Sequence, residues 1–159
     1  MNLETERKFL VKDDSYKKEA VKSYEISQGY IAREEGNTVR VRLRDGVGFL
    51  TIKGRTTENG LSRPEWEMEI PADDARELMA LCKRGRIQKI RHIIPAGDGL
   101  KWEVDEFLGD NTGLVMAEIE LPSPETPFSR PAWLSTEVTG AKEFYNSYLS
   151  AHPFSTWGK

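Results

Sequence analysis

Charged residues occupy every second position in run after run of this chain, and mostly apolar residues fill the positions between them. These runs lie at 4–8, 40–44, 65–69, 89–91, 103–105 and 118–120. Because successive side chains of a β-strand point to opposite faces, each run has one charged face and one apolar face. The charged faces carry carboxylates, ammoniums and guanidiniums in place of the usual mixture of Thr, Ser, Gln and Lys. The chain must therefore fold so that one side of its sheet accommodates a dense layer of charge.

The strand pattern is short and regular. Alternating runs bounded by turn residues predict about eight strands. They lie near 2–10, 27–32, 38–44, 48–53, 63–70, 86–94, 100–107 and 115–121. Turn residues at 45–46 and 97–99 lie between consecutive runs, where hairpins need positive φ, so these neighbours are expected to pair antiparallel.

Three helical patterns interrupt the strands. The sequence predicts one helix near 14–23, a second over 72–84 and a third over 139–151, each from capping residues or from apolar residues at helical spacing. Trp66 and Trp102 stand between charged neighbours on their runs, so they are expected on the apolar face, packed under these helices.

Composition limits the class of protein. A length of 159 residues favours one domain spanning 1–159, and a net charge of −3 gives no general attraction to nucleic acids or anionic membranes. No apolar run reaches the roughly 18 residues of a membrane span. The single cysteine, Cys82, cannot form an internal disulfide. We expect a soluble, cytoplasmic protein with no membrane or nucleic-acid partner, and the sequence leaves open whether it forms a homodimer.

Two architectures satisfy the alternation equally well. In an open antiparallel sheet the apolar face packs on the helices and the charged face meets water. In a closed barrel the apolar face turns outward and the charges line the lumen. Like charges on an open face would repel without gain. In a lumen, two unit charges 4 Å apart repel by roughly 4 kcal/mol at an effective dielectric of about 20 unless something binds between them. The carboxylates favour the barrel, with divalent cations and an anionic ligand inside.

The charged runs supply ligands for both kinds of ion. Glu4 with Glu6, and Glu118 with Glu120, each present two hard oxygen ligands to one volume, which suits Mg²⁺ or Mn²⁺. Either pair alone is more simply explained as a solvated strand face. Donors for phosphate oxygens are Lys8, Arg40, Arg42, Lys53, Lys89 and Arg91. The interleaved acids would repel a long polyanion such as a nucleic acid.

The order of these motifs resembles that of the CYTH domain family, whose members are the triphosphate tunnel metalloenzymes. The likeness opens with Glu4-x-Glu6-x-Lys8. It continues through Gln28-Gly29-Tyr30-Ile31, Val39-Arg40-Val41-Arg42, Thr51-Ile52-Lys53, Arg63-Pro64-Glu65-Trp66-Glu67, Lys89-Ile90-Arg91, Glu103-Val104-Asp105, Ala117-Glu118-Ile119-Glu120-Leu121 and Glu137-Val138-Thr139-Gly140. The match spans nearly the whole chain in order, which makes it far more specific than its first motif.

The resemblance implies a β-dominated α+β fold, an eight-stranded antiparallel closed barrel with helices packed outside and a C-terminal helix that plugs the tunnel. It also implies roles for individual residues. The metal-binding acids are Glu4, Glu6, Glu118 and Glu120. The residues that grip the phosphate chain are Lys8, Arg40, Arg42, Lys53, Arg63, Lys89 and Arg91. The catalytic group, near the attacking water or a second metal, comprises Lys8, Tyr30, Glu65, Glu67 and Asp105.

The activity implied is hydrolysis of a linear triphosphate that depends on Mg²⁺ or Mn²⁺. Inorganic tripolyphosphate is the expected substrate, because the chain carries only the core motifs with short connections. Branches of the family that act on thiamine triphosphate, nucleotides or RNA, or that cyclise ATP, remain alternatives. A non-catalytic binder of polyphosphate or nucleotide is another, as is an open-sheet interaction module. The residues after Gly140 depart from the family pattern, so no substrate contact is assigned to the C-terminal helix.

Overall fold

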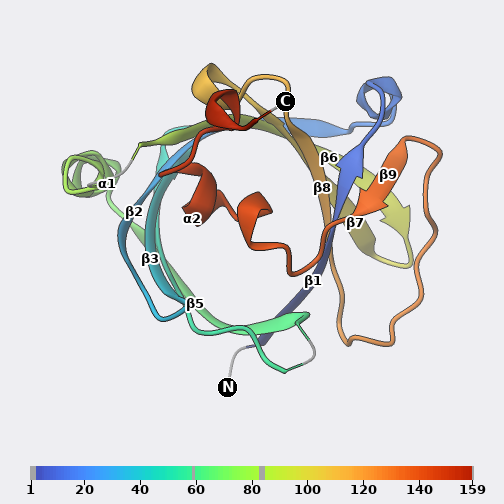
Figure 1. Cartoon of the computed structure of the whole chain (residues 1–159), viewed down its shortest axis with the longest axis horizontal. Helices are drawn as coiled ribbons and strands as arrows, with labels where there is room; N and C mark the ends of the chain where they lie inside the picture. Colours follow the sequence, from blue (N-terminus) through green and yellow to red (C-terminus); the bar gives the residue numbers. More distant parts are fainter. Residues whose placement is uncertain (1–2, 59, 83–84, 159) are drawn as a thin grey trace.

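The computed structural model describes residues 3–58, 60–82 and 85–158 and consists mainly of β-strands (Figure 1). The strands are β1 (Leu3–Val11), β2 (Lys22–Glu34), β3 (Asn37–Arg44), β4 (Val47–Lys53), β5 (Ser62–Ile70), β6 (Ile87–Gly97), β7 (Leu100–Phe107), β8 (Val115–Glu120) and β9 (Leu134–Glu137). The α-helices are α1 (Ala72–Met79) and α2 (Asn146–Leu149), and single 3₁₀ turns form η1 (Ser15–Lys18), η2 (Gly109–Asn111), η3 (Lys142–Phe144) and η4 (Phe154–Thr156).

Eight of these strands close into an antiparallel barrel. The sheet runs in the order β5-β4-β3-β2-β6-β7-β8-β1, and β1 pairs back onto β5, which closes the ring. The closing ladder is short and joins three residues of β1, beginning at Leu3, to Pro64, Arg63 and Ser62. The barrel predicted from the charged alternation is confirmed, because an open sheet would leave β1 and β5 as free edges.

A ninth strand, absent from the prediction, extends this closing seam. Phe9 pairs with Ala117 of β8 on one side and with Glu137 of β9 on the other. Strand β9 therefore lies on the same edge of β1 as β5, further along the strand. Strand β9 has only four residues, most of them polar, so it gives no alternating signal in the sequence.

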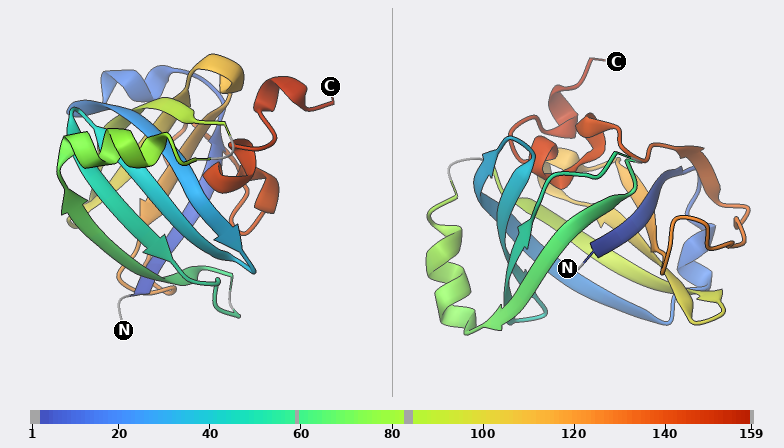
Figure 2. Two further views of the ribbon diagram at one scale, coloured as in Figure 1. Left: turned by 90° about the vertical axis from the view of Figure 1, so that its left-hand side faces the viewer. Right: turned by 90° about the horizontal axis from the view of Figure 1, so that it is seen from below.

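The outer face of the barrel is apolar and carries much of the core. Helix α1 packs on β2, β3 and β4 (Figure 2, left), where Ala75 and Met79 bury against Val41. A Cβ at Gly48 would lie 2.9 Å from the Ala75 Cβ, so glycine at this position permits the close approach of the helix. On the outer side of β1, β7 and β8, Phe9 and Trp102 join a second cluster of buried apolar residues. The outward apolar face was predicted, and α1 covers it as expected.

The lumen is apolar at one end. Ile87, Phe107 and Met116 each lie two residues from Lys89, Asp105 or Glu118 on the same strand face, and they form a buried cluster with Leu149 of α2. Phe144, Phe154 and Trp157 pack against this cluster. Figure 1 shows the C-terminal segment inside the ring of strands, where it covers that end of the barrel.

Several helix predictions were wrong. The segment predicted as a helix near 14–23 forms only η1, because residues from Lys22 onward pair with β6 from Ile93 to Ile87. The helix predicted over 139–151 is broken into η3 and α2 by Tyr145, whose backbone is extended at φ −76° and ψ 137°.

The second helix is shorter than predicted, and one tryptophan is not covered. Helix α1 ends at Met79, and the last two residues of the predicted range 72–84 lie outside the described residues. Trp66 remains 46% exposed because α1 packs mainly on β2, β3 and β4. Trp102 is buried as expected, but it lies beside Phe128 and Trp133 instead of under a helix. No helix in the described part of the chain is long and apolar enough to cross a membrane.

Candidate active site

The barrel encloses a cavity of about 200 Å³ whose walls are mostly charged. Every site residue predicted from the sequence lines it except Asp105. Those residues are Glu4, Glu6, Lys8, Tyr30, Arg40, Arg42, Lys53, Arg63, Glu65, Glu67, Lys89, Arg91, Glu118 and Glu120. They share the cavity because each occupies an inward-facing position of its strand. The alternation seen in the sequence is thus the alternation between lumen and exterior.

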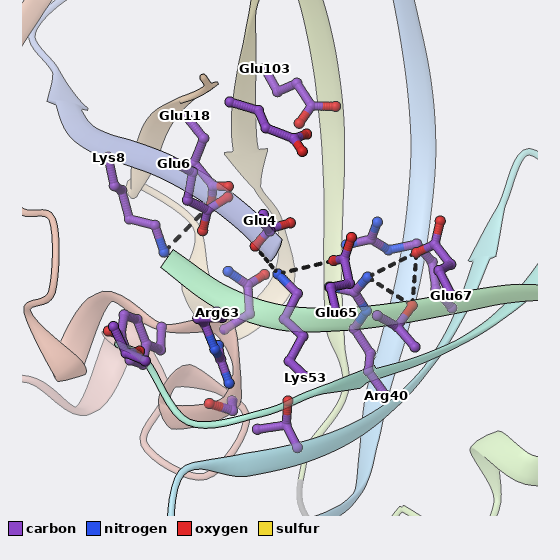
Figure 3. A pocket seen from close by; sticks show the side chains of 18 of the residues that line it. Glu4, Glu6, Lys8, Arg40, Lys53, Arg63, Glu65, Glu67, Glu103 and Glu118 are labelled. Carbon is purple, nitrogen blue, oxygen red and sulfur yellow. Dashed lines mark hydrogen bonds and ion pairs between the residues drawn. The ribbon is translucent and has the colours of Figure 1, made fainter. Parts of the chain in front are cut away.

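The acidic side of the cavity is formed by β1 and β8. Their register places Glu6 opposite Glu120 and Lys8 opposite Glu118. Figure 3 shows the side chains of Glu4, Glu6 and Glu118 close together in the cavity. Four carboxyl groups from two adjacent strands therefore face one small volume.

Two of these acids have pKa values that shift in opposite directions. Burial, followed by the charge of Glu118, raises the pKa of Glu6 well above its usual value. Burial alone would raise the pKa of Glu118 too, but Lys8 and a hydrogen bond with Glu6 hold that pKa well below the usual value. The raised pKa favours the protonated form of Glu6, and a divalent cation that binds there would replace that proton, because metal ligands must be deprotonated. The donor set fits a hard cation.

Lysines pair with the acids in this structure. Lys53 Nζ lies 2.8 Å from Glu4 Oε1 and 3.5 Å from Glu65 Oε2, and Lys8 Nζ lies 3.5 Å from Glu118 Oε1 (Figure 3). Within the ranges that the structure describes, no three acidic, histidine or cysteine groups are gathered closely enough to hold a metal ion. Of the four acids on β1 and β8, Glu4 and Glu118 are each paired with an ammonium group among the described residues.

The basic side is formed by β3 and β6. Burial, then the charges of Arg40 and Arg91, lowers the pKa of Arg42 to about 9. Arg40 donates from Nη2 to Thr51 Oγ1 at 3.1 Å, while its buried Nε has no hydrogen-bond partner among the described residues. A buried donor without a partner is costly. Crowded cations with an unused donor indicate a place for an anionic ligand.

Asp105 lies behind this basic wall and not in the cavity lining. It accepts from Lys89 Nζ at 2.7 Å and from Arg91 Nε and Nη2 at 2.8 and 2.9 Å. Burial raises its pKa, but Arg91 and Lys89 outweigh burial and lower it to about 2. Burial also lowers the pKa of Lys89 to about 7, although Asp105 opposes that shift. Asp105 is thus placed to hold two lumen cations, whereas the sequence predicted it near the attacking water.

The other predicted catalytic acids lie on β5. Glu65 contacts Lys53, and Glu67 accepts from Thr51 Oγ1 at 2.8 Å. Arg63, on the same strand, donates to the carbonyl oxygens of Gly54 and Gly36 at 3.0 and 3.1 Å. Arg63 therefore ties neighbouring connections to the seam of the barrel as well as facing the cavity.

Tyr30 lies on β2, beside a residue to which the sequence assigned no role. The hydroxyl of Tyr30 accepts from Gln28 Nε2 at 3.3 Å, and Gln28 Oε1 accepts from Arg42 Nε at 2.8 Å. Gln28 is completely buried. Its inward position on β2, two residues from Tyr30, was the available signal.

The sequence also missed the contribution of the C-terminal segment. Thr139, Gly140, Tyr145, Asn146 and Ser147 line the cavity. Lys8 Nζ donates to the carbonyl oxygen of Phe144 at 3.0 Å and lies 5.2 Å from the centre of the Tyr145 ring. The helical pattern gave no sign of these contacts, because the break at Tyr145 aims polar groups into the lumen.

Comparison with known proteins identifies the family. The model of the CYTH domain matches residues 2–150. This chain belongs to the CYTH domain family. The match covers the barrel and α2, so the closed barrel with its charged lumen is the fold of a CYTH domain.

Relatives of this CYTH domain bear a common name. This chain is 44% identical over 158 residues to an inorganic triphosphatase of Acetivibrio thermocellus, with 99% of each chain covered. It is 31% identical over 150 residues to an inorganic triphosphatase of Nitrosomonas europaea, which covers 92% of this chain and 96% of the relative. The crystal structure of the inorganic triphosphatase NE1496 superposes with a TM-score of 0.63 at 28% identity, covering 92% and 96% of the two chains.

Proposed function

We propose that this CYTH domain hydrolyses inorganic tripolyphosphate to pyrophosphate and orthophosphate with a divalent metal ion. The observation that carries the proposal is the lumen, in which buried cations of β3 and β6 share one cavity with acids of β1 and β8. One ligand with several negative charges, accompanied by a divalent cation, satisfies both walls. The names of the relatives at 44% and 31% identity support the same activity.

The size of the cavity favours an inorganic substrate. Its volume of about 200 Å³ is below the roughly 300–1,000 Å³ of pockets that enclose drug-sized organic ligands. A nucleotide or thiamine triphosphate would have to leave its organic part outside the barrel. The C-terminal segment fills one end, so only the opposite end has room for such a group.

Glu4, Glu6, Glu118 and Glu120 would hold Mg²⁺ or Mn²⁺. The bound ion would supply positive charge that neutralises phosphate oxygens and helps to fix the substrate. The ion pair at 2.8 Å between Lys53 and Glu4 would open on loading, which frees the Lys53 ammonium for the phosphate chain. The metal ion would then replace the Lys53 ammonium as the positive charge beside Glu4.

The remaining residues would bind and orient the reactants. Lys8, Lys53, Lys89, Arg40, Arg42, Arg63 and Arg91 would hold the phosphate oxygens, and arginine can do so bidentately. Glu65, Glu67 and Tyr30 would orient a water molecule in line with a terminal phosphorus. Asp105 would keep Lys89 and Arg91 in place. Phosphoryl transfer depends mainly on positioning and charge neutralisation, which these groups supply.

We further propose that the protein acts in the cytoplasm. Its one cysteine, Cys82, is unpaired, as is usual in a reducing compartment.

The direct test measures phosphate release from tripolyphosphate with Mg²⁺ or Mn²⁺, beside ATP, thiamine triphosphate, pyrophosphate and an EDTA control. We expect metal-dependent release from tripolyphosphate and little from the others. The Glu6→Gln variant is expected to lose activity, whereas Glu69→Gln, an acid on β5 outside the cavity lining, is expected to keep it. A rise in melting temperature with tripolyphosphate but no phosphate release would instead indicate a binding module. Release from an organic triphosphate alone would indicate another CYTH activity.

A further inference from the structure

The C-terminal segment contacts two lumen lysines from different strands. Lys8 of β1 donates to the carbonyl oxygen of Phe144, and Lys89 of β6 donates to Asn146 Oδ1 at 2.9 Å. Each ammonium also contacts one carboxylate, Glu118 at 3.5 Å or Asp105 at 2.7 Å. Because an ammonium has three N–H groups, each lysine keeps one for the cavity that it lines.

A chain of side chains fixes the orientation of Asn146. Arg42 can only donate, so Gln28 presents its oxygen to Arg42 Nε at 2.8 Å and its NH₂ group to the other side. Gln28 Nε2 then donates to Asn146 Oδ1 at 3.1 Å. Lys89, which also can only donate, contacts the same oxygen. Donor-only cations at both ends therefore force Asn146 to turn its oxygen, and not its NH₂ group, toward Lys89.

We propose that Asn146 is a positioning residue of the triphosphatase site, which acts by holding the Lys89 ammonium so that its remaining N–H points into the cavity. This proposal rests on the proposed function for its kinetic consequence. Asp105 fixes one N–H of Lys89 from behind, and Asn146 fixes a second from the end of the barrel. Once two of the three N–H bonds of Lys89 are fixed, the tetrahedral geometry of the ammonium sets the direction of the third.

An uncharged acceptor suits this position. Lys89 is 2% exposed, and Asp105 already serves both Lys89 and Arg91. A second carboxylate in place of Asn146 would neutralise the positive charge that a phosphate oxygen needs. The amide oxygen orients the ammonium and leaves its charge available to the substrate.

The kinetic test compares three variants. Asn146→Ala removes the acceptor, and we expect kcat to fall by roughly 10- to 100-fold, the cost of a misplaced group, while KM changes less than about threefold. Asn146→Asp keeps an oxygen at the same place, so kcat is expected to recover at least about tenfold relative to Asn146→Ala. Its added charge is expected to raise KM for tripolyphosphate about tenfold or more. Glu143→Gln, an exposed change on the same segment, serves as the control.

A spectroscopic measurement tests the positioning without relying on turnover. In protein labelled with ¹⁵N-lysine, the Lys89 ammonium signal should shift in Asn146→Ala and stay unchanged in Glu143→Gln. The proposal is overturned if Asn146→Ala keeps the wild-type kcat, if kcat and KM change together with a large drop in melting temperature, or if the Lys89 signal does not move. Wild-type protein that releases no phosphate from tripolyphosphate refutes the proposed function, while the Lys89 signal still decides the role of Asn146.

Discussion

Replacing Asp105 with asparagine removes the only carboxylate that lies within 3 Å of either buried cation of β6 in the described part of the chain. Asp105 is 2% exposed and accepts hydrogen bonds from Lys89 and from two nitrogens of Arg91. Asparagine has nearly the same shape, but it carries no charge and can accept through one oxygen only. Asp105→Asn therefore tests the charge while leaving the packing almost unchanged.

Two effects set the magnitude of the loss. Depression of the Asp105 pKa from 3.8 to about 2 corresponds to about 2 kcal/mol of stability at neutral pH. Removing one partner of a buried ion pair also leaves the other charges uncompensated, which costs about 3–5 kcal/mol in all. We expect Asp105→Asn to lose about 3–5 kcal/mol of unfolding free energy, or roughly 6–20 °C in Tm for a chain of this size.

Urea unfolding at several pH values measures this loss. Because the folded pKa of Asp105 lies below the unfolded value, its contribution is complete above pH 3.8 and is lost as the pH falls toward about 2. The gap between wild type and Asp105→Asn should shrink across that window. Glu103→Gln is the matched control, since Glu103 Oε2 lies 3.5 Å from Arg91 Nη1 on a partly exposed side chain and should cost less than about 1 kcal/mol. A loss below about 1 kcal/mol in Asp105→Asn, or a gap independent of pH, would refute the reasoning.

Three further predictions concern the ligands. Glu4→Gln should abolish metal-dependent phosphate release, and turnover equal to wild type would disprove its assignment as a metal ligand. Arg42→Ala should raise KM for tripolyphosphate far more than it lowers kcat, which steady-state kinetics would show; a fall in kcat alone would contradict a role in substrate capture. Because the pKa of Glu6 is raised in the folded state, the metal-free protein loses stability as the pH rises above the unfolded pKa of 4.5. The same rise in pH removes the proton that competes with a cation for Glu6. The rise in Tm on adding Mg²⁺ should therefore be larger at about pH 8 than at about pH 5, and equal or opposite shifts would count against a shared site on Glu6 and Glu118.

Local alternation made the lumen predictable. Arg40 and Arg42, or Glu65 and Glu67, face the same way simply because they are two residues apart on a strand. Closure of the barrel followed from the need to neutralise so many like charges. These inferences depend on neighbours in the sequence and on charge, both of which the sequence contains.

Features that depend on tertiary contacts could not be derived from the sequence. Asp105 is two residues from Glu103 and has the same inward-facing position on β7. Its carboxylate binds Lys89 and Arg91 and does not line the cavity. Only the register between β6 and β7 shows which cations lie beside it. The segment after Gly140 has helical spacing because its single turns pack on one apolar cluster. The break at Tyr145 that brings Asn146 to Lys89 is imposed by that packing and not by local propensity.

The seam of the barrel also sets the order in which the chain can fold during synthesis. Strand β1 is made first, yet its partners are residues 62–64 and, through the pair Glu6↔Glu120, a strand 114 positions later. At about 5–20 residues per second, the ribosome needs roughly 6–23 s to supply that partner. Until then at least one edge of β1 is free, and strands with free edges tend to aggregate unless charges protect them. Glu4, Glu6 and Lys8 would thus keep the nascent chain from associating before they ever meet a substrate.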